Sequence, residues 1–164
     1  SWTVEKQRDF MKASKLLDII RKNLKDYPID YLRNKATDDR YKDPLTKKLA
    51  KYNSSVYDDI YGTDILDDFE IKDNIIKNMR ADIGFYFDTY AGGDEENKRF
   101  TENISLYLAL ISKRPLHPYG EDKKEDVFCL RGVYYCKGRA KYINDKRSLC
   151  RYCVCKNVPF NMMF

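Results

Sequence analysis

The cysteines of this chain are confined to its carboxyl end. All five lie between Cys129 and Cys155, and the preceding 128 residues contain none. The one histidine, His117, lies a short distance upstream of them. Thiolate and imidazole groups are the donors that zinc prefers in proteins. The carboxyl end is therefore predicted to fold around a metal site.

The rest of the chain shows the periodicity of amphipathic helices. Apolar side chains recur at intervals of three and four residues and predict helices over residues 4–27, 44–62, 65–90 and 94–111. Asp43 and Pro44 mark the start of the second helix as an N-cap and a first-turn proline, and Gly92 follows the end of the third. The third segment is either one helix or two helices broken near Asp73.

The segment between the first two helices, residues 29–43, is polar and rich in turn formers. We expect an irregular connection there with at most one helical turn, and no strand before residue 125. The predicted fold is mainly α, a helical bundle of about four helices over residues 1–115. A small C-terminal β-hairpin and metal-binding module, residues 116–164, is expected to pack on that bundle.

The excess positive charge of the chain lies at its carboxyl end. Residues 121–164 hold ten basic and five acidic residues, which leaves 21 of each sign in residues 1–120. This asymmetry suits an acidic partner, but a small metal module that keeps its charged side chains in water explains it better. No run of 18 apolar residues occurs. We therefore expect a soluble, cytoplasmic protein that is not secreted and has no membrane partner.

The segment around the first two cysteines has the composition of a hairpin. Strands are predicted near 126–129 and 133–136, joined by a three-residue loop, Leu130–Gly132. With that loop, Cys129 and Cys136 would be separated by about 10 Å along the strands, at about 3.3 Å per residue. Two sulfurs on one zinc ion are about 4 Å apart, so these two cysteines are not expected to share an ion.

Cys150 and Cys153 form a C-x2-C pair, the spacing with which a tight turn binds one metal ion. Ser148 is placed to cap that turn. The loop after His117 is long enough to return its imidazole to the far end of the hairpin, beside Cys136. The predicted metal ligands are His117, Cys136, Cys150 and Cys153.

Alternatives exist for both the ligand set and the metal. Cys129 or Cys155 would replace His117 if the hairpin has another shape. Zn2+ is the expected metal, because a mixed set of sulfur and nitrogen donors suits it. An iron-sulfur cluster is the competing cofactor, since Cys150, Cys153 and Cys155 supply three closely spaced thiolates. Reduced thiols without a metal are a further possibility, and disulfides are the least expected in a cytosolic chain.

Three short motifs give the carboxyl end a resemblance to a known family. They are His117-Pro118-x-Gly120, Gly132-Val133-Tyr134-Tyr135-Cys136 and Leu149-Cys150-x-Tyr152-Cys153. They resemble the HPxG, GVYYC and LCxFC signature of an uncharacterised family, found mainly in methanogenic archaea and classed as a domain of unknown function. The resemblance implies a helical amino-terminal region and the same four metal ligands, with Cys129 and Cys155 as extras. It implies no activity.

Three functions are compatible with these features. The first is a non-catalytic interaction or assembly protein, accessory to a larger enzyme complex in a methanogen, in which zinc clips the basic end to the helical body. The second is a nucleic-acid-binding protein whose basic side chains contact phosphates while tyrosines stack on bases. Its candidate residues are Lys137, Arg139, Lys141, Lys146, Arg147 and Arg151. The third is a zinc-thiolate enzyme with one open position on the metal, although the sequence indicates no catalytic residue.

Overall fold

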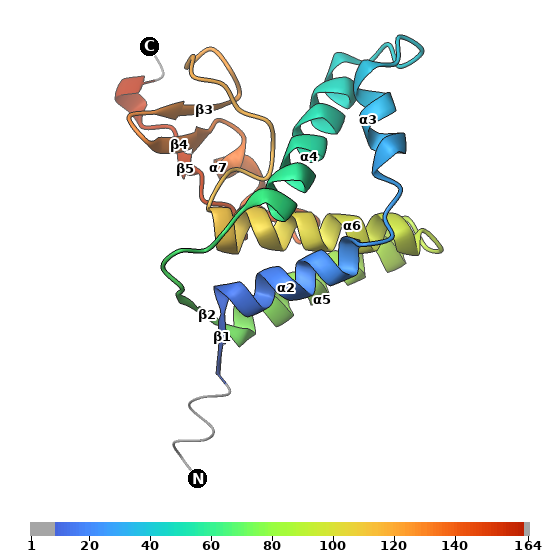
Figure 1. Ribbon diagram of the computed structural model, residues 1–164. Helices are drawn as coiled ribbons and strands as arrows, with labels where there is room; N and C mark the ends of the chain where they lie inside the picture. The colour runs from blue at the N-terminus through green and yellow to red at the C-terminus, as the bar shows by residue number, and fades with distance from the viewer. Residues whose placement is uncertain (1–8, 163–164) are drawn as a thin grey trace.

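The computed structural model describes residues 9–162, which are mainly helical (Figure 1). The long helices are α2 (Ala13–Leu24), α3 (Ile29–Thr37), α4 (Pro44–Gly62), α5 (Asp73–Tyr90) and α6 (Glu95–Leu106), the last continued by a π-helical turn, η1 (Tyr107–Ser112). The strands are β1 (Phe10–Lys12), β2 (Glu70–Lys72), β3 (Val127–Leu130), β4 (Val133–Cys136) and β5 (Lys156–Asn157). Short helical turns are α7 (Arg139–Tyr142), η2 (Cys150–Tyr152) and η3 (Phe160–Met162). The predicted mainly helical class with small β elements near the carboxyl end is confirmed.

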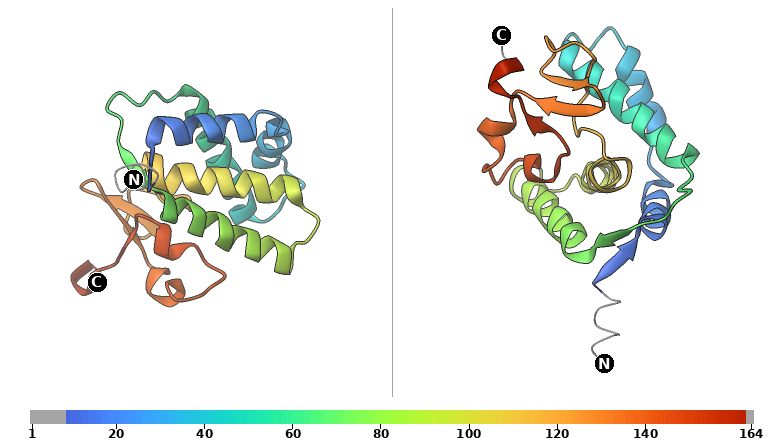
Figure 2. Two further views of the ribbon diagram at one scale, coloured as in Figure 1. Left: turned by 90° about the horizontal axis from the view of Figure 1, so that it is seen from below. Right: turned by 90° about the vertical axis from the view of Figure 1, so that its left-hand side faces the viewer.

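Helix α6 lies at the centre of the molecule. Figure 2 shows it end-on, with α2, α4, α5 and the carboxyl-terminal residues arranged around it. From Asn103 of α6 to Ala109 of η1 every residue is buried, so this end of the helix is covered on all sides, whereas most of residues 95–99 are exposed. It begins at Asp94, whose carboxylate accepts a hydrogen bond from the Asn97 N–H at 3.2 Å.

The predicted helix over residues 44–62 is confirmed as α4. The carboxylate of Asp43 accepts a hydrogen bond from the Leu45 N–H at 3.1 Å, and Pro44 occupies the first turn, as the sequence indicated. The third predicted helix is shorter than expected, because α5 begins only at Asp73. It ends at Tyr90, directly before the Gly92 turn.

The expectation of no strand before residue 125 is wrong. Residues 10–12 do not extend the first helix but form β1, which pairs antiparallel with β2 so that Met11 lies opposite Ile71. Both strands have three residues, too few to show an alternating pattern, and their partners are distant in the sequence. The part of that predicted helix over residues 4–8 lies outside the described residues.

The predicted irregular connection over residues 29–43 is also wrong, because most of it forms α3. None of the residues of α3 is buried, which explains why its sequence lacks an apolar stripe. The helix lies against α4, and its Arg33 pairs with Asp58 of that helix at 2.6 Å. Contacts with α4, rather than a buried apolar face, therefore hold α3 in place.

Residues 116–162, the C-terminal module, contain the predicted hairpin with a shorter loop than expected. Leu130 pairs with Val133, so the turn consists of Arg131 and Gly132 alone, at φ values of 52° and 77°. Two positive φ angles are typical of the type I′ turn, which joins two strands with two residues. Cys129 therefore faces Tyr134 rather than Val133. Strand β5 then adds to β4 in parallel.

The C-terminal module has few buried side chains of its own. Among its described residues, those buried are Val127, Phe128 and Cys155. It contacts the helical body through Leu116 and Tyr152, which pack against the core, and through polar links such as the 3.2 Å ion pair between Lys48 and Glu125. No helix within residues 9–162 is long and apolar enough to cross a membrane.

Tyr52 of α4 holds the linker that enters the C-terminal module. Its hydroxyl donates a hydrogen bond to the carbonyl oxygen of Pro115 at 2.5 Å, and its ring meets that of Tyr119 edge-on at 5.9 Å. Pro115 is itself buried. Loss of the hydroxyl would leave a buried carbonyl without this donor.

We expect Tyr52→Phe to lower the free energy of unfolding by about 0.5–1.5 kcal/mol, the usual net contribution of one such hydrogen bond. Urea denaturation of the two proteins measures the difference. Tyr90→Phe, at a side chain that is 57% exposed, is the matched control and should change stability little. Equal effects of the two changes would contradict the role given to Tyr52.

Candidate metal centre

A cavity of about 410 Å³ separates the C-terminal module from the helical body. The body supplies one wall from α4 and α6, and the module supplies the other. All four predicted metal ligands line this cavity: His117, Cys136, Cys150 and Cys153. Cys155 lines it too, whereas Cys129 on β3 is not among its lining residues. The fold thus brings together donors from the linker, the hairpin and the C-x2-C turn.

Cys136 ends β4, where the chain turns into α7. The backbone N–H groups of Gly138 and Arg139 donate hydrogen bonds to its sulfur. Burial raises the pKa of the Cys136 thiol, those two N–H groups oppose the rise, and the nearby sulfurs of Cys153 and Cys150 add to it. N–H groups directed at a sulfur stabilise it as a thiolate, the form that binds metals.

The C-x2-C turn is held from both sides. The Ser148 hydroxyl oxygen accepts a hydrogen bond from the Cys150 N–H at 3.3 Å, which is the capping role predicted for it. The same hydroxyl donates to the carbonyl oxygen of Tyr142 at 2.6 Å and so joins the turn to α7. The turn therefore presents its two cysteines from a fixed backbone.

Cys153 has the most thiolate-stabilising surroundings. A hydrogen bond from the Cys155 thiol lowers the pKa of Cys153 to about 6, against the effect of burial. Backbone N–H groups of Cys155 and Leu116 and the adjacent His117 act in the same direction. The pKa of the Cys155 thiol is correspondingly raised, because it donates to Cys153.

The four predicted donors line one cavity, but they are not arranged around a common metal position. Within residues 9–162, no group of three or more His, Cys, Asp or Glu side chains is positioned to hold a metal ion. All five cysteines are free thiols in the described part of the chain, and His117 is exposed at the cavity edge. The donor types nevertheless fit zinc, since three sulfurs and one imidazole form a recognised zinc set. The ligand assignment stays a prediction.

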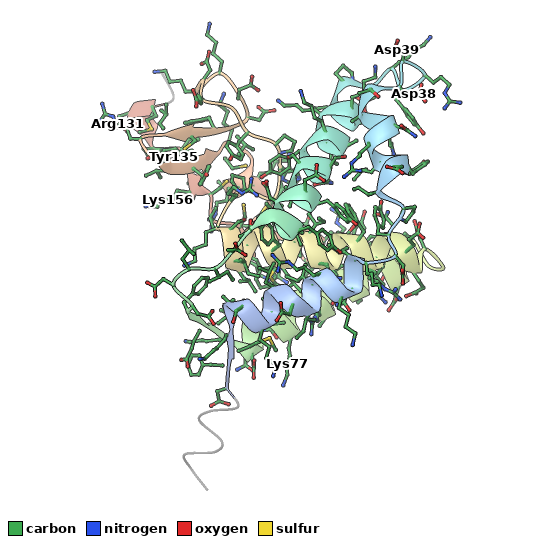
Figure 3. All side chains as sticks on the ribbon, in the orientation of Figure 1. Asp38, Asp39, Lys77, Arg131, Tyr135 and Lys156 are labelled. Carbon is green, nitrogen blue, oxygen red and sulfur yellow. The ribbon has the colours of Figure 1, made fainter. Side chains whose placement is uncertain are left out.

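The six basic residues considered for nucleic-acid binding are mostly engaged within the molecule. Arg147 pairs with Asp145 at 3.1 Å, and the ammonium group of Lys137 donates to the carbonyl oxygen of Lys124 at 3.1 Å. Lys141 lies over the ring of Tyr142, Arg151 pairs with Asp82, and Arg139 faces the cavity. Arg131 and Lys156, by contrast, lie at the outer edge of the module, away from α4 (Figure 3). Nucleic-acid binding stays a prediction.

Two contributions to the site were missed by reasoning from the sequence. The helical body supplies polar groups to the cavity from Asn53 of α4 and from Thr101 and Ser105 of α6. Those residues lie within amphipathic segments and carry no motif that could have identified them. Arg139 lines the same cavity, although the sequence suggested only a surface role for it.

Asp82 of α5 anchors the C-x2-C turn to the body. One of its carboxylate oxygens accepts hydrogen bonds from both the Arg151 guanidinium and the Tyr152 hydroxyl, the two residues between Cys150 and Cys153. The Arg151 guanidinium also lies over the Tyr152 ring, 4.9 Å from its centre. A single carboxylate thus fixes the middle of the proposed metal-binding turn.

Comparison with known proteins gives one family. The model of a family described as "Uncharacterized protein conserved in archaea (DUF2115)" matches residues 12–158. A UPF0305 protein of Methanocaldococcus jannaschii is 28% identical over 161 residues, which cover 90% of this chain and 98% of the relative. One of Methanothermobacter thermautotrophicus is 26% identical over 88% of this chain and 95% of its own length, and one of Methanococcus maripaludis is 29% identical over 57% of each chain. No solved structure matches the chain.

We expect Asp82→Asn to loosen the C-x2-C turn while leaving the helical body intact. Amide hydrogen exchange at residues 150–153 should accelerate about two- to fivefold, as expected for the loss of a partly exposed ion pair. Asp88→Asn is the matched control, because Asp88 lies on the same helix and pairs with Lys98 at 3.3 Å, outside the turn. Unchanged exchange in the first variant would show that α5 does not hold the turn.

Proposed function

The chain belongs to the archaeal family DUF2115, whose description names no activity, and we propose a function for it from its site. It is a metal-binding protein in which zinc fastens the C-terminal module to the helical body. The assembled protein serves as a non-catalytic interaction or assembly component, accessory to a larger enzyme complex in a methanogen. His117, Cys136, Cys150 and Cys153 hold the metal, with Cys155 or Cys129 as alternatives for the fourth position.

The size of the module's core supports a structural metal. Residues 116–162 bury only Val127, Phe128 and Cys155 among their described side chains. Chain segments below about 40 residues usually need a disulfide, a metal or a partner to stay folded, and this module is little longer. Its cysteines form no disulfide in the described residues. Binding of a metal by side chains from three separate segments would supply the missing free energy of folding.

The observation that carries the proposal is the joint placement of the four donors in one cavity. A hydrogen bond from the Cys155 thiol and backbone N–H groups lower the pKa of Cys153 to about 6, whereas at Cys136 burial outweighs the two N–H groups and the pKa stays raised. When bound, zinc supplies a cross-link between the linker, the hairpin and the C-x2-C turn. An iron-sulfur cluster remains the alternative cofactor, since three cysteines of one short segment lie together here.

The other two functions have less support. Nucleic-acid binding would need basic side chains that are free to contact phosphates, and Arg147 and Arg151 are paired with carboxylates. A zinc-thiolate enzyme would need a metal position left open by the protein, whereas the proposed set of four donors fills a tetrahedron. Both functions stay predictions of lower rank.

An exposed aromatic patch on α5, formed by Phe85, Tyr86 and Tyr90, is the proposed contact for a protein partner. These side chains are 58%, 41% and 57% exposed, and the rings of Tyr86 and Tyr90 lie 5.3 Å apart. Aromatic residues are enriched at the centres of protein interfaces, where they bury large rigid surfaces. The patch continues the helix face that holds the C-x2-C turn through Asp82, so it depends on the same arrangement.

We expect the purified protein to contain one equivalent of zinc and to be colourless. Cys150→Ser and Cys153→Ser should each abolish zinc binding, whereas Cys129→Ser should retain it, because Cys129 does not line the cavity. Elemental analysis of proteins purified without oxygen measures this. A brown protein that contains iron would show that the cofactor is an iron-sulfur cluster instead of zinc. Zinc retained in Cys153→Ser would contradict the ligand set.

Removal of the metal should unfold the C-terminal module and spare the body. After chelation, hydrogen exchange is expected to accelerate within residues 117–158, while α2 keeps its protection because its core residues do not line the site. Unchanged exchange and an unchanged thermal unfolding curve would exclude a structural metal. Cobalt substitution identifies the fourth ligand, since the thiolate-to-cobalt absorption should weaken in Cys155→Ser only if Cys155 is bound.

We expect Phe85→Ser and Tyr90→Ser to weaken capture of a protein partner about tenfold or more, as loss of an aromatic anchor does. The measurement is the yield of a specific co-purifying protein from methanogen cells that express the tagged chain. Leu66→Ser is the control, because Leu66 is 97% exposed but lies outside the patch. Equal yields from all variants would show that the patch on α5 is not the contact surface.

A further inference from the structure

The cavity at the proposed metal centre is much larger than one ion requires. Its volume of about 410 Å³ falls within the range of small-molecule sites, about 300–1,000 Å³. The wall supplied by the helical body is largely apolar, with the buried Phe100 and Ile104 of α6 and Leu108 of η1, and Thr101 and Ser105 add two hydroxyl groups to it. A tetrahedral ion bound by the module would leave this wall facing empty space. The cavity therefore has room for an organic molecule beside the metal.

The lining of the cavity contains basic side chains but no acidic ones. The residues that line the cavity include Arg139, Arg147 and His117 but no aspartate or glutamate, although the chain contains 26 acidic residues. The Arg147 guanidinium already has a carboxylate partner, Asp145. Arg139 has none, since the ion pairs of residues 9–162 do not include it.

Arg139 also carries an unsatisfied donor. Its Nε is buried and has no hydrogen-bond partner among the described residues. A buried donor of a charged group without an acceptor is destabilising by more than a neutral one, and such groups are rare in native structures unless a ligand or water completes them. Guanidinium groups bind carboxylates through parallel N–H donors, of which Nε–H is one. The Arg139 guanidinium therefore has a buried N–H donor that a carboxylate ligand could accept from.

We propose that this cavity binds a small organic carboxylate, with its apolar body on the α6 wall and its carboxylate on the Arg139 guanidinium. A monoanion matches the single unpaired guanidinium. A phosphate ester carries nearly two charges, and the second would be buried in a mostly apolar cavity without a partner. The ligand class is therefore a carboxylic acid with an aromatic or short aliphatic body.

This inference rests on the proposed function in one respect, because the metal orders the module that carries Arg139. Arg139 and the α6 wall are not themselves metal ligands. A different role for Arg139 would be to balance the negative charge of the bound thiolates, and its charge does lower the pKa of Cys155. The two roles differ in what the loss of the guanidinium removes, which is ligand binding in the first and metal binding in the second.

The test uses the zinc-loaded chain and three aromatic probes: benzoate, its neutral isostere benzamide, and phenyl phosphate. Titration calorimetry measures binding, and the zinc content of every sample is determined alongside. We expect benzoate to bind at least about tenfold more tightly than benzamide, which lacks the charge that Arg139 pairs with. Phenyl phosphate should bind more weakly than benzoate. Benzamide binding as tightly as benzoate would overturn the proposal.

Arg139→Gln should weaken benzoate binding about tenfold or more and leave benzamide binding unchanged. Arg139→Lys keeps the positive charge but loses the paired N–H donors of the guanidinium. Its affinity for benzoate should lie between that of the unmodified protein and that of Arg139→Gln. Lys141→Gln is the matched control, because Lys141 lies on the same short helix over the Tyr142 ring and should not affect benzoate. Zinc loss in Arg139→Gln with benzoate binding unchanged per folded molecule would assign Arg139 to charge balance instead.

The outcomes separate this proposal from the proposed function. Benzoate that fails to bind a fully zinc-loaded protein refutes the carboxylate site and leaves the structural metal in place. Benzoate that binds a protein without zinc supports the carboxylate site and counts against the metal. If Arg139→Gln does not fold, the comparison of the three probes on the unmodified protein still decides the matter.

Discussion

The rest of the structure depends on the burial of one continuous stretch, from Asn103 in the last turn of α6 to Ala109 of η1. Every residue of this stretch is buried, so α2, α4, α5 and the C-terminal module must together cover all of its faces. The π-helical turn that follows ends at Lys113 in the left-handed region, with a φ of 54°, and the Arg114 N–H closes it on the carbonyl oxygen of Leu108 at 2.9 Å. Short π-helical turns are frequent at functional sites, and this one directs the linker toward the cavity.

The C-terminal module is attached by polar contacts together with two partly buried side chains, Leu116 and Tyr152, that pack against the core of the body. Tyr52 holds the linker through the Pro115 carbonyl, and Asp82 holds the C-x2-C turn through Arg151 and Tyr152. Such contacts are directional and individually weak, so they position the module without ordering all of it. The sulfurs of Cys136, Cys150 and Cys153 line the cavity between the module and the body. The thiolate-stabilising N–H groups at Cys136 and Cys153 lie at this place.

The cavity is a consequence of the same construction. A module that touches the body at its edges leaves a space in the middle, bounded by the apolar side of α6 and by the cysteines. Arg139 faces that space because its short helix follows directly on Cys136. A metal and an anionic molecule would then occupy neighbouring parts of one cavity, and the affinity for each would depend on the order of the module.

The sequence determined the features that depend on neighbouring residues. The cap at Asp43, the two strands of the hairpin and the Ser148 cap of the C-x2-C turn were all predictable, because turn chemistry and helical periodicity act over a few residues. The sequence did not predict α3, because that helix has no buried residue. It also did not predict the β1–β2 pair, because these strands are short and far apart in the chain. Only the tertiary structure decided that α6 is central, that Cys155 lines the cavity while Cys129 does not, and that Arg139 points inward. These outcomes depend on which distant segments cover one another, and side chains with the same local pattern are buried or exposed according to that packing.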